Sequence, residues 1–211
     1  MTAHADLAYA LARLQARLGA RPSDAHWRDL EAAQTTTQAL SVTRQGPLTH
    51  WLDGVAQADE AAALEQRLRQ RWAREVATVA GWLPPRWRAA VHLQGRLAPW
   101  PLAAEDTASD DGADRLADWA AAWPRALPAD AATGVPWRAA AEQLCPRLRG
   151  DTVGRPARSG AAERALVRLF RGHAGTAVPA FAYLALAALD LERLRGALVA
   201  RAMFETETEA A

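Results

Sequence analysis

Apolar residues in this chain recur with the period of an α-helix. In the clearest run, successive apolar side chains stand three or four positions apart: Leu64, Leu68, Trp72, Val76, Val79 and Leu83. This spacing places them on one face of a helix, which must be buried against other elements. No segment shows sustained alternation of apolar and polar residues, and β-branched residues are scarce. The sequence therefore predicts an all-α, bundle-like fold of several helices.

Prolines, glycines and capping residues set the expected ends of these helices. The first helix ends at Gly19, Ser23 or Asp24 caps the second, and Pro84 and Pro85 end the helix that carries the run above. Further helices are expected near residues 48–55, 116–123, 136–148, 161–171 and 179–204.

An acidic stretch, residues 102–114, separates two groups of expected helices. It contains five acidic residues and no basic one, among small side chains that bury too little apolar area to become ordered. We predict an N-terminal helical lobe at 1–101, a flexible acidic loop at 102–114, a C-terminal lobe at 115–205 and a disordered tail at 206–211. A single domain over the whole chain is the alternative.

Composition excludes several classes of function. All 25 basic residues are Arg, and there is no Lys, so a phosphate-loop lysine, a Schiff-base lysine and a lysine general base are all absent. With 24 acidic residues the formal net charge is +1, which gives no overall field for nucleic acid or an anionic membrane. Nucleic acid is therefore not indicated as a partner.

No motif predicts catalysis, a cofactor or a metal. The five His are dispersed without HExxH spacing, there is no GxSxG, and Cys145 is the single cysteine, read as a buried structural thiol. The longest apolar run, 178–189, is too short to cross a bilayer and predicts a buried helical segment. We expect a cytoplasmic protein with no transmembrane segment that is not an enzyme. An enzyme whose site assembles from distant residues is one alternative.

The nine Trp and the Arg-rich margins of the expected helices could belong to the core, to an interface or to a solvated surface. Large aromatic residues on helical stripes usually fill a core, although Trp is also common at interface hot spots, and we expect the core. We expect a solvated face made of Glu65, Arg67, Arg69, Arg71, Arg74 and Glu75, with a pair between Glu65 and Arg69.

A second alternative function comes from the Gly-rich segment GDTVGRPARSG. Arg155 and Arg158 stand there before an expected helix, and a helix N-terminus is a natural site for an anion. This predicts an Arg-mediated anion-binding or nucleic-acid-binding helical domain. A flexible connector is the other interpretation of the segment.

The terminal helices resemble those of a known family. AYALARLQARLG, with Tyr9 and Arg13, and YLALAALDLERLRGALVAR are similar to the ends of the C or d-type central-stalk subunits of V-type and A-type rotary ATPases. In that family the last helix carries an acid followed by Asn-Leu-Arg. Asp190 matches the acid, and Leu194 and Arg195 match Leu-Arg. Arg193 replaces the Asn, and the family's short basic finish falls near Arg201.

The resemblance implies a helical, funnel-like, non-enzymatic socket between a rotor shaft and a membrane ring. It covers about a fifth of the chain, which is shorter than family members. It implies rotary ATPase components as partners, peripheral membrane association through a partner, and interaction roles for Tyr9, Arg13, Asp190, Leu194 and Arg195. The residues alone give a broader prediction: a non-catalytic adaptor that binds an unidentified protein, with the last helix as docking element. On that helix Asp190 and Arg193 can also pair as surface neighbours.

Overall fold

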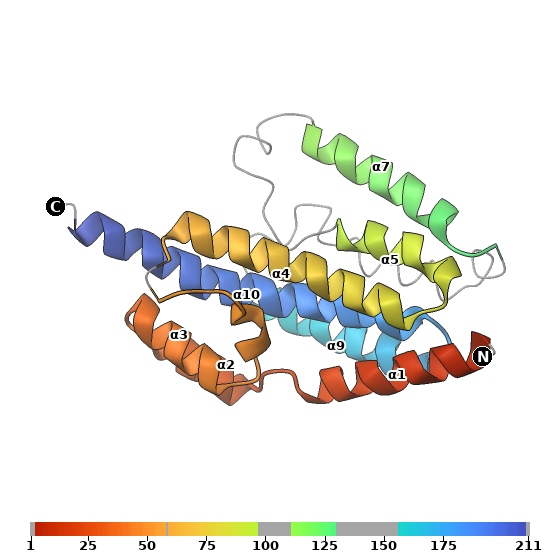
Figure 1. Ribbon diagram of the computed structural model, residues 1–211, viewed down its shortest axis with the longest axis horizontal. Helices are drawn as coiled ribbons and strands as arrows, with labels where there is room; N and C mark the ends of the chain where they lie inside the picture. Colours follow the sequence, from red (N-terminus) through yellow and green to blue (C-terminus); the bar gives the residue numbers. More distant parts are fainter. Residues whose placement is uncertain (1–2, 58, 97–110, 130–155, 210–211) are drawn as a thin grey trace. The chain divides into compact units, whose positions relative to one another are not determined.

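The computed structural model describes residues 3–57, 59–96, 111–129 and 156–209, and every regular element in these ranges is helical (Figure 1). The all-α prediction is confirmed. The expected helix at 136–148, Cys145 and residues 102–110 of the acidic loop lie outside the described residues. The α-helices are α1 (Ala3–Gly19), α2 (Asp24–Ala32), α3 (Thr36–Gln45), α4 (Ala61–Trp82), α5 (Arg88–Gly95), α7 (Asp111–Ala126), α9 (Pro156–Gly172) and α10 (Val178–Glu209).

Two short helices begin with hydroxyl caps. Ser23 Oγ accepts a hydrogen bond from the backbone N–H of His26 at the start of α2 (3.3 Å), as one of the two expected caps. Thr35 Oγ1 accepts from Gln38 N at the start of α3 (3.2 Å). Each cap satisfies a backbone N–H that has no partner within the helix.

Four boundaries differ from those predicted. α7 begins at Asp111, inside the predicted acidic loop, and continues past Pro124 to Ala126. α9 begins at Pro156 rather than 161, which suits proline because the first helical residue needs no N–H partner. α10 continues to Glu209, through part of the predicted disordered tail. The expected helix at 48–55 is a single 3-10 turn, η1 (Thr49–Leu52).

The described residues pack as two compact units. The first consists of the described residues within Met1–Gln15 and Val76–Leu189, and the second of those within Ala16–Glu75 and Asp190–Ala211. The chain passes from one unit to the other within α1, α4 and α10. The predicted division at residues 102–114 was based on composition, whereas these two units are defined by spatial contacts. The two lobes remain a prediction.

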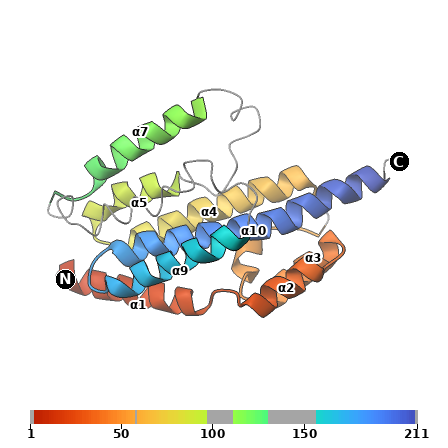
Figure 2. The ribbon, with the colours of Figure 1, turned by 180° about the vertical axis from the view of Figure 1, so that it is seen from behind.

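Aromatic side chains form the core of the first unit. The Phe181 ring meets Trp87 and Trp123 edge to face, with centroids 6.3 and 5.4 Å apart, and Trp119 stacks on Trp123 at 5.7 Å. α5 packs beside α7 (Figures 1 and 2), and Trp119 Nε1 donates to the carbonyl of Leu93 at 2.9 Å. The apolar run at 178–189 is a largely buried helical segment of α10, as predicted.

The second unit is built on α4 and the later part of α10. Trp51 of η1 stacks on Trp72 of α4, with ring centroids 6.4 Å apart. α3 packs against α2 and η1. At the end of α3, Gly46 lies so close to the His26 ring that a Cβ would stand 2.0 Å from its Cε1 atom, so any larger residue would displace this ring.

The α4 stripe and most of the Trp predictions are confirmed. All six apolar stripe residues from Leu64 to Leu83 are buried. Six Trp are also buried: Trp27, Trp51, Trp72, Trp87, Trp119 and Trp123. Trp82 is half-buried, whereas Trp100 and Trp137 lie outside the described residues.

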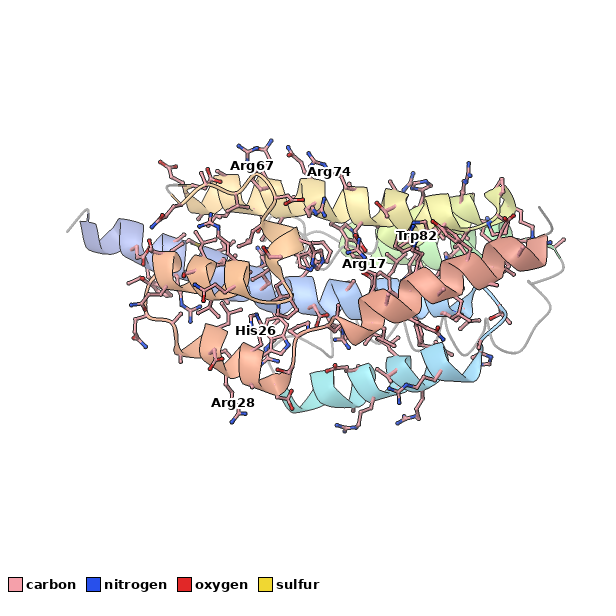
Figure 3. All side chains as sticks on the ribbon, turned by 60° about the horizontal axis from the view of Figure 1, so that its bottom comes forward. Arg17, His26, Arg28, Arg67, Arg74 and Trp82 are labelled. Atoms are coloured by element: carbon pink, nitrogen blue, oxygen red, sulfur yellow. The ribbon has the colours of Figure 1, made fainter. Side chains whose placement is uncertain are left out.

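The predicted solvated face of α4 is right for Arg67, Arg69 and Arg74, which are exposed, and wrong for Arg71 and Glu75. The Arg71 side chain is only 19% exposed and pairs with Asp53. Arg67 and Arg74 point outward from α4 (Figure 3), and Glu65 accepts a hydrogen bond from Arg69 Nη2 at 2.9 Å. Glu75 is 2% exposed, however. It directly precedes Val76 of the buried stripe, and Arg17 Nη1 lies 3.9 Å from its carboxylate, so a cation compensates its burial.

Candidate functional site

The C-terminal end of α10 is fixed to the last turn of α2 by one Arg side chain. Arg201 Nε donates to the carbonyl of Ala33 (2.8 Å), and its Nη2 donates to those of Leu30 (3.2 Å) and Glu31 (3.0 Å). Carbonyls at a helix C-terminus lack intrahelical partners and carry partial negative charge, so a guanidinium suits them. Arg201 therefore caps α2 and holds α10 in place.

Glu205, one turn later on α10, makes the complementary contact with α3. Its Oε1 accepts a hydrogen bond from the backbone N–H of Thr36, 2.7 Å away. Thr36 is the first residue of α3, where the N–H groups have no partner in the helix and favour a negative charge. Arg201 and Glu205 thus fix the end of α10 on both sides of the α2–α3 connection.

Two large apolar side chains lie between these two anchors and face solvent. Met203 is 54% exposed and Phe204 is 65% exposed, whereas Ala202 beside them is buried. The buried seam of α10 in this unit consists of Leu191, Leu194, Leu198 and Ala202. Met203 and Phe204 fall outside that seam. Single exposed apolar residues are ordinary, but two adjacent ones on a fixed helix form a candidate contact surface.

Three of the predicted interaction residues instead hold the second unit together. Asp190 accepts hydrogen bonds from Arg21 Nε (2.7 Å) and Nη2 (2.8 Å). Leu194 is fully buried, and Arg195 forms an ion pair with Glu65 of α4. Their contacts are intramolecular: Asp190 binds Arg21 in the connection between α1 and α2, and Arg195 binds Glu65 of α4.

The other predicted site residues are either exposed or not among the residues and side chains that the structure describes. Tyr9 and Arg13 are exposed on α1, and the Arg13 guanidinium lies 5.1 Å from the Tyr9 ring centroid. Arg155 lies outside the described residues; Arg158 belongs to α9, but its side chain is not described.

Arg193 makes its contacts with α2. It lies over the Trp27 ring at 4.5 Å, and its Nε and Nη2 both donate to Glu31. The expected i,i+3 neighbours Asp190 and Arg193 therefore both bind residues outside α10: Asp190 binds Arg21 in the connection between α1 and α2, and Arg193 binds Glu31 of α2.

A group of charged side chains also surrounds η1. Burial lowers the pKa of His50 below its ordinary value of 6.5, against the opposing effect of the Glu75 carboxylate. His50 Nδ1 lies 3.1 Å from the Pro47 carbonyl, and Arg71 Nη1 lies 3.3 Å from Asp53. Arg17, labelled in Figure 3, lies near Glu75. This arrangement pairs charges within the protein, so we assign it a structural role.

Within the described ranges, no group of three or more His, Cys, Asp or Glu side chains is placed to hold a metal ion. Likewise, none of the helices in the described part of the chain is long and apolar enough to cross a membrane. Comparisons of the chain with protein-family models, curated proteins and solved structures find no match. The resemblance to central-stalk subunits is untested by them and stays an expectation.

Sequence reasoning missed the exposed pair and its second anchor, although one signal was present. The last helix was predicted to end near Phe204, which placed Glu205 beyond its end. The seam at Leu191, Leu194 and Leu198 extends by helical spacing to residue 202, so Met203 and Phe204 fall outside it. In the sequence, large apolar residues outside the buried stripe of a helix were the feature that could have predicted a contact surface.

Proposed function

We propose that this protein is a non-catalytic helical adaptor that binds a protein partner through the C-terminal end of α10. The observation that carries the proposal is the exposure of the consecutive residues Met203 and Phe204 between Arg201 and Glu205. Aromatic residues and Met are enriched in the buried centres of protein interfaces. The exposed pair therefore has the chemistry of an anchor for an apolar pocket on a partner.

The anchors at Arg201 and Glu205 favour binding by limiting what must be ordered. Association costs free energy for every segment that becomes immobile, and a segment already fixed costs less. The backbone around Met203 and Phe204 is helical and held to α2 and α3 by hydrogen bonds. A partner would have to order only the two exposed side chains, and Met adapts readily to an apolar surface.

The resemblance of the terminal helices supports a more specific form of this proposal. The partner would be a component of a rotary ATPase, and the protein would associate with a membrane through that partner from the cytoplasm. The support is the similarity of the Tyr9–Arg13 and Asp190–Arg195 stretches alone. The adaptor proposal does not depend on this identification.

Site-specific crosslinking tests the proposal most directly. A photoreactive phenylalanine analogue replaces Phe204 in one variant and Arg67, which points outward from α4, in the control (Figure 3). Both variants are expressed in the native cell, and crosslinked products are identified by mass spectrometry. We expect one protein to crosslink at position 204 and not at position 67.

A second pair of variants separates specific capture from background. The tagged double variant Met203→Ser/Phe204→Ser should lose the protein crosslinked at position 204, whereas Arg67→Ser should retain it at wild-type level. Recovery of rotary ATPase subunits would support the specific form. Equal recovery with the double variant, or equal crosslinking at both positions, would contradict the adaptor proposal.

A further inference from the structure

An arginine on α1 lies close to two aromatic rings in the first unit. The Arg13 guanidinium carbon lies 5.1 Å from the centroid of Tyr9 on α1 and 6.0 Å from that of Trp82 at the end of α4. Both distances are within the range of cation–π attraction. Arg13 and Tyr9 are exposed and Trp82 is half-buried, so solvent reaches the group. Tyr, Trp and Arg are also the residues most enriched at binding hot spots.

The second unit contains a similar stack that is completed by a carboxylate. Arg193 lies over Trp27 at 4.5 Å, and its Nε and Nη2 both donate to Glu31. The ring contacts the face of the guanidinium, while the carboxylate takes the hydrogen-bond donors at its edge. A planar guanidinium offers these two surfaces at the same time, which an ammonium group does not.

Arg13 lacks the second half of this arrangement. No carboxylate of the described residues lies within ion-pair distance of it, and none of its nitrogens donates to a described acceptor. Its face is occupied by rings, and its donors are open to solvent. Stacking limits the rotation of the side chain, so the donors are already oriented for a planar acceptor.

We propose that Tyr9, Arg13 and Trp82 form a recognition site for a carboxylate on an acidic segment of a partner protein. The Arg193–Glu31 contact shows which acceptor completes such a stack in this chain. The site goes beyond the proposed role of the α10 end, because its residues belong to a different unit and it requires neither Met203 nor Phe204.

A fluorescein-labelled hexaglutamate peptide is the probe, followed by fluorescence anisotropy at low ionic strength. Charge-assisted hydrogen bonds lost in Arg13→Gln should weaken binding about tenfold or more. Arg13→Lys keeps the charge and loses the planar fork, so it should also weaken binding, by a smaller factor. Trp82→Leu should weaken binding about twofold to fivefold through loss of stacking.

Arg67→Gln is the matched control, because Arg67 is exposed on α4, points outward in Figure 3 and has no ring of the described residues stacked on it. It should change the Kd by less than about twofold. The Nε–H resonance of Arg13 should also shift on titration with the peptide. Circular dichroism checks that each variant folds. If Arg13→Gln does not fold, Arg13→Lys takes its place in the binding test.

Three results would overturn the inference. One is absence of hexaglutamate binding to the wild-type protein. Another is equal weakening by Arg67→Gln and Arg13→Gln, which would mean general attraction to positive charge. The third is tighter, Arg13-dependent binding of a hexathymidylate probe, which would assign the site to phosphate. Met203→Ser/Phe204→Ser should bind hexaglutamate like the wild type. The proposed partner site at the end of α10 and the proposed carboxylate site at Arg13 can therefore be refuted independently.

Discussion

Replacement of Asp190 should destabilise the protein through the charge that it leaves behind. Arg21 and Asp190 are 14% and 9% exposed and share two short hydrogen bonds. Removal of one partner of a buried ion pair costs about 3–5 kcal/mol, because the remaining charge stays desolvated. Since both side chains keep some contact with solvent, we expect about 2–4 kcal/mol for Asp190→Asn. That loss lowers the Tm by about 5–15 °C for a chain of this size.

The measurement is urea unfolding followed by far-UV circular dichroism, for Asp190→Asn, Arg21→Gln and the double variant. Removal of both charges should cost about 1–3 kcal/mol less than the sum of the two single changes. The control is Arg69→Gln at the exposed end of the Glu65–Arg69 pair, which should cost about 0.5 kcal/mol or less. Single changes below about 1 kcal/mol that add without coupling would refute the reasoning.

Two further perturbations test the close packing of α5 and the burial around η1. Gly95→Ala should lower the free energy of unfolding by about 1–3 kcal/mol, although Ala is the better helix former, because its Cβ would stand 2.7 Å from Val76 Cγ1. Val76→Ala in the same chain should recover part of the loss, and a gain from Gly95→Ala alone would contradict the close approach. Burial lowers the pKa of His50, so below pH 6.5 the unfolded chain binds more protons and stability falls as the pH drops toward the folded pKa. The slope of unfolding free energy between about pH 7 and about pH 5 should be shallower in His50→Gln, and an unchanged slope would contradict this account.

Helical periodicity predicted the parts of the fold that depend on burial of one face. The α4 stripe is an example, because each position from Leu64 to Leu83 follows the helical repeat and is buried. Composition predicted helix ends less well. Asp111 and Pro124 were expected to lie outside or end a helix, but α7 includes both. α7 packs against α5, and Trp119 Nε1 of α7 donates a hydrogen bond to the Leu93 carbonyl of α5. This tertiary packing stabilises α7 beyond the length that its local sequence favours.

Contacts between distant residues were beyond what a single sequence shows. Arg21 and Asp190 are 169 positions apart, and nothing in the local pattern of either residue indicates the other. Glu75 looked like one member of a solvated charged face, but it follows Trp72 at helical spacing and so lies at the edge of the buried stripe. Charged residues that adjoin a buried stripe should therefore be treated as candidates for internal ion pairs.

The arginines of this chain differ in the acceptors and rings that contact them. A comparison of these contacts indicates which arginine could bind a partner. Arg201 uses its fork on three helix-end carbonyls, and Arg21 uses two donors on Asp190. Arg193 combines a ring contact with a carboxylate. In each case the planar group satisfies acceptors that a single ammonium would contact less completely. Arg13 has the ring contacts without the acceptor among the described residues, so its stack is the arrangement that a partner's carboxylate would complete.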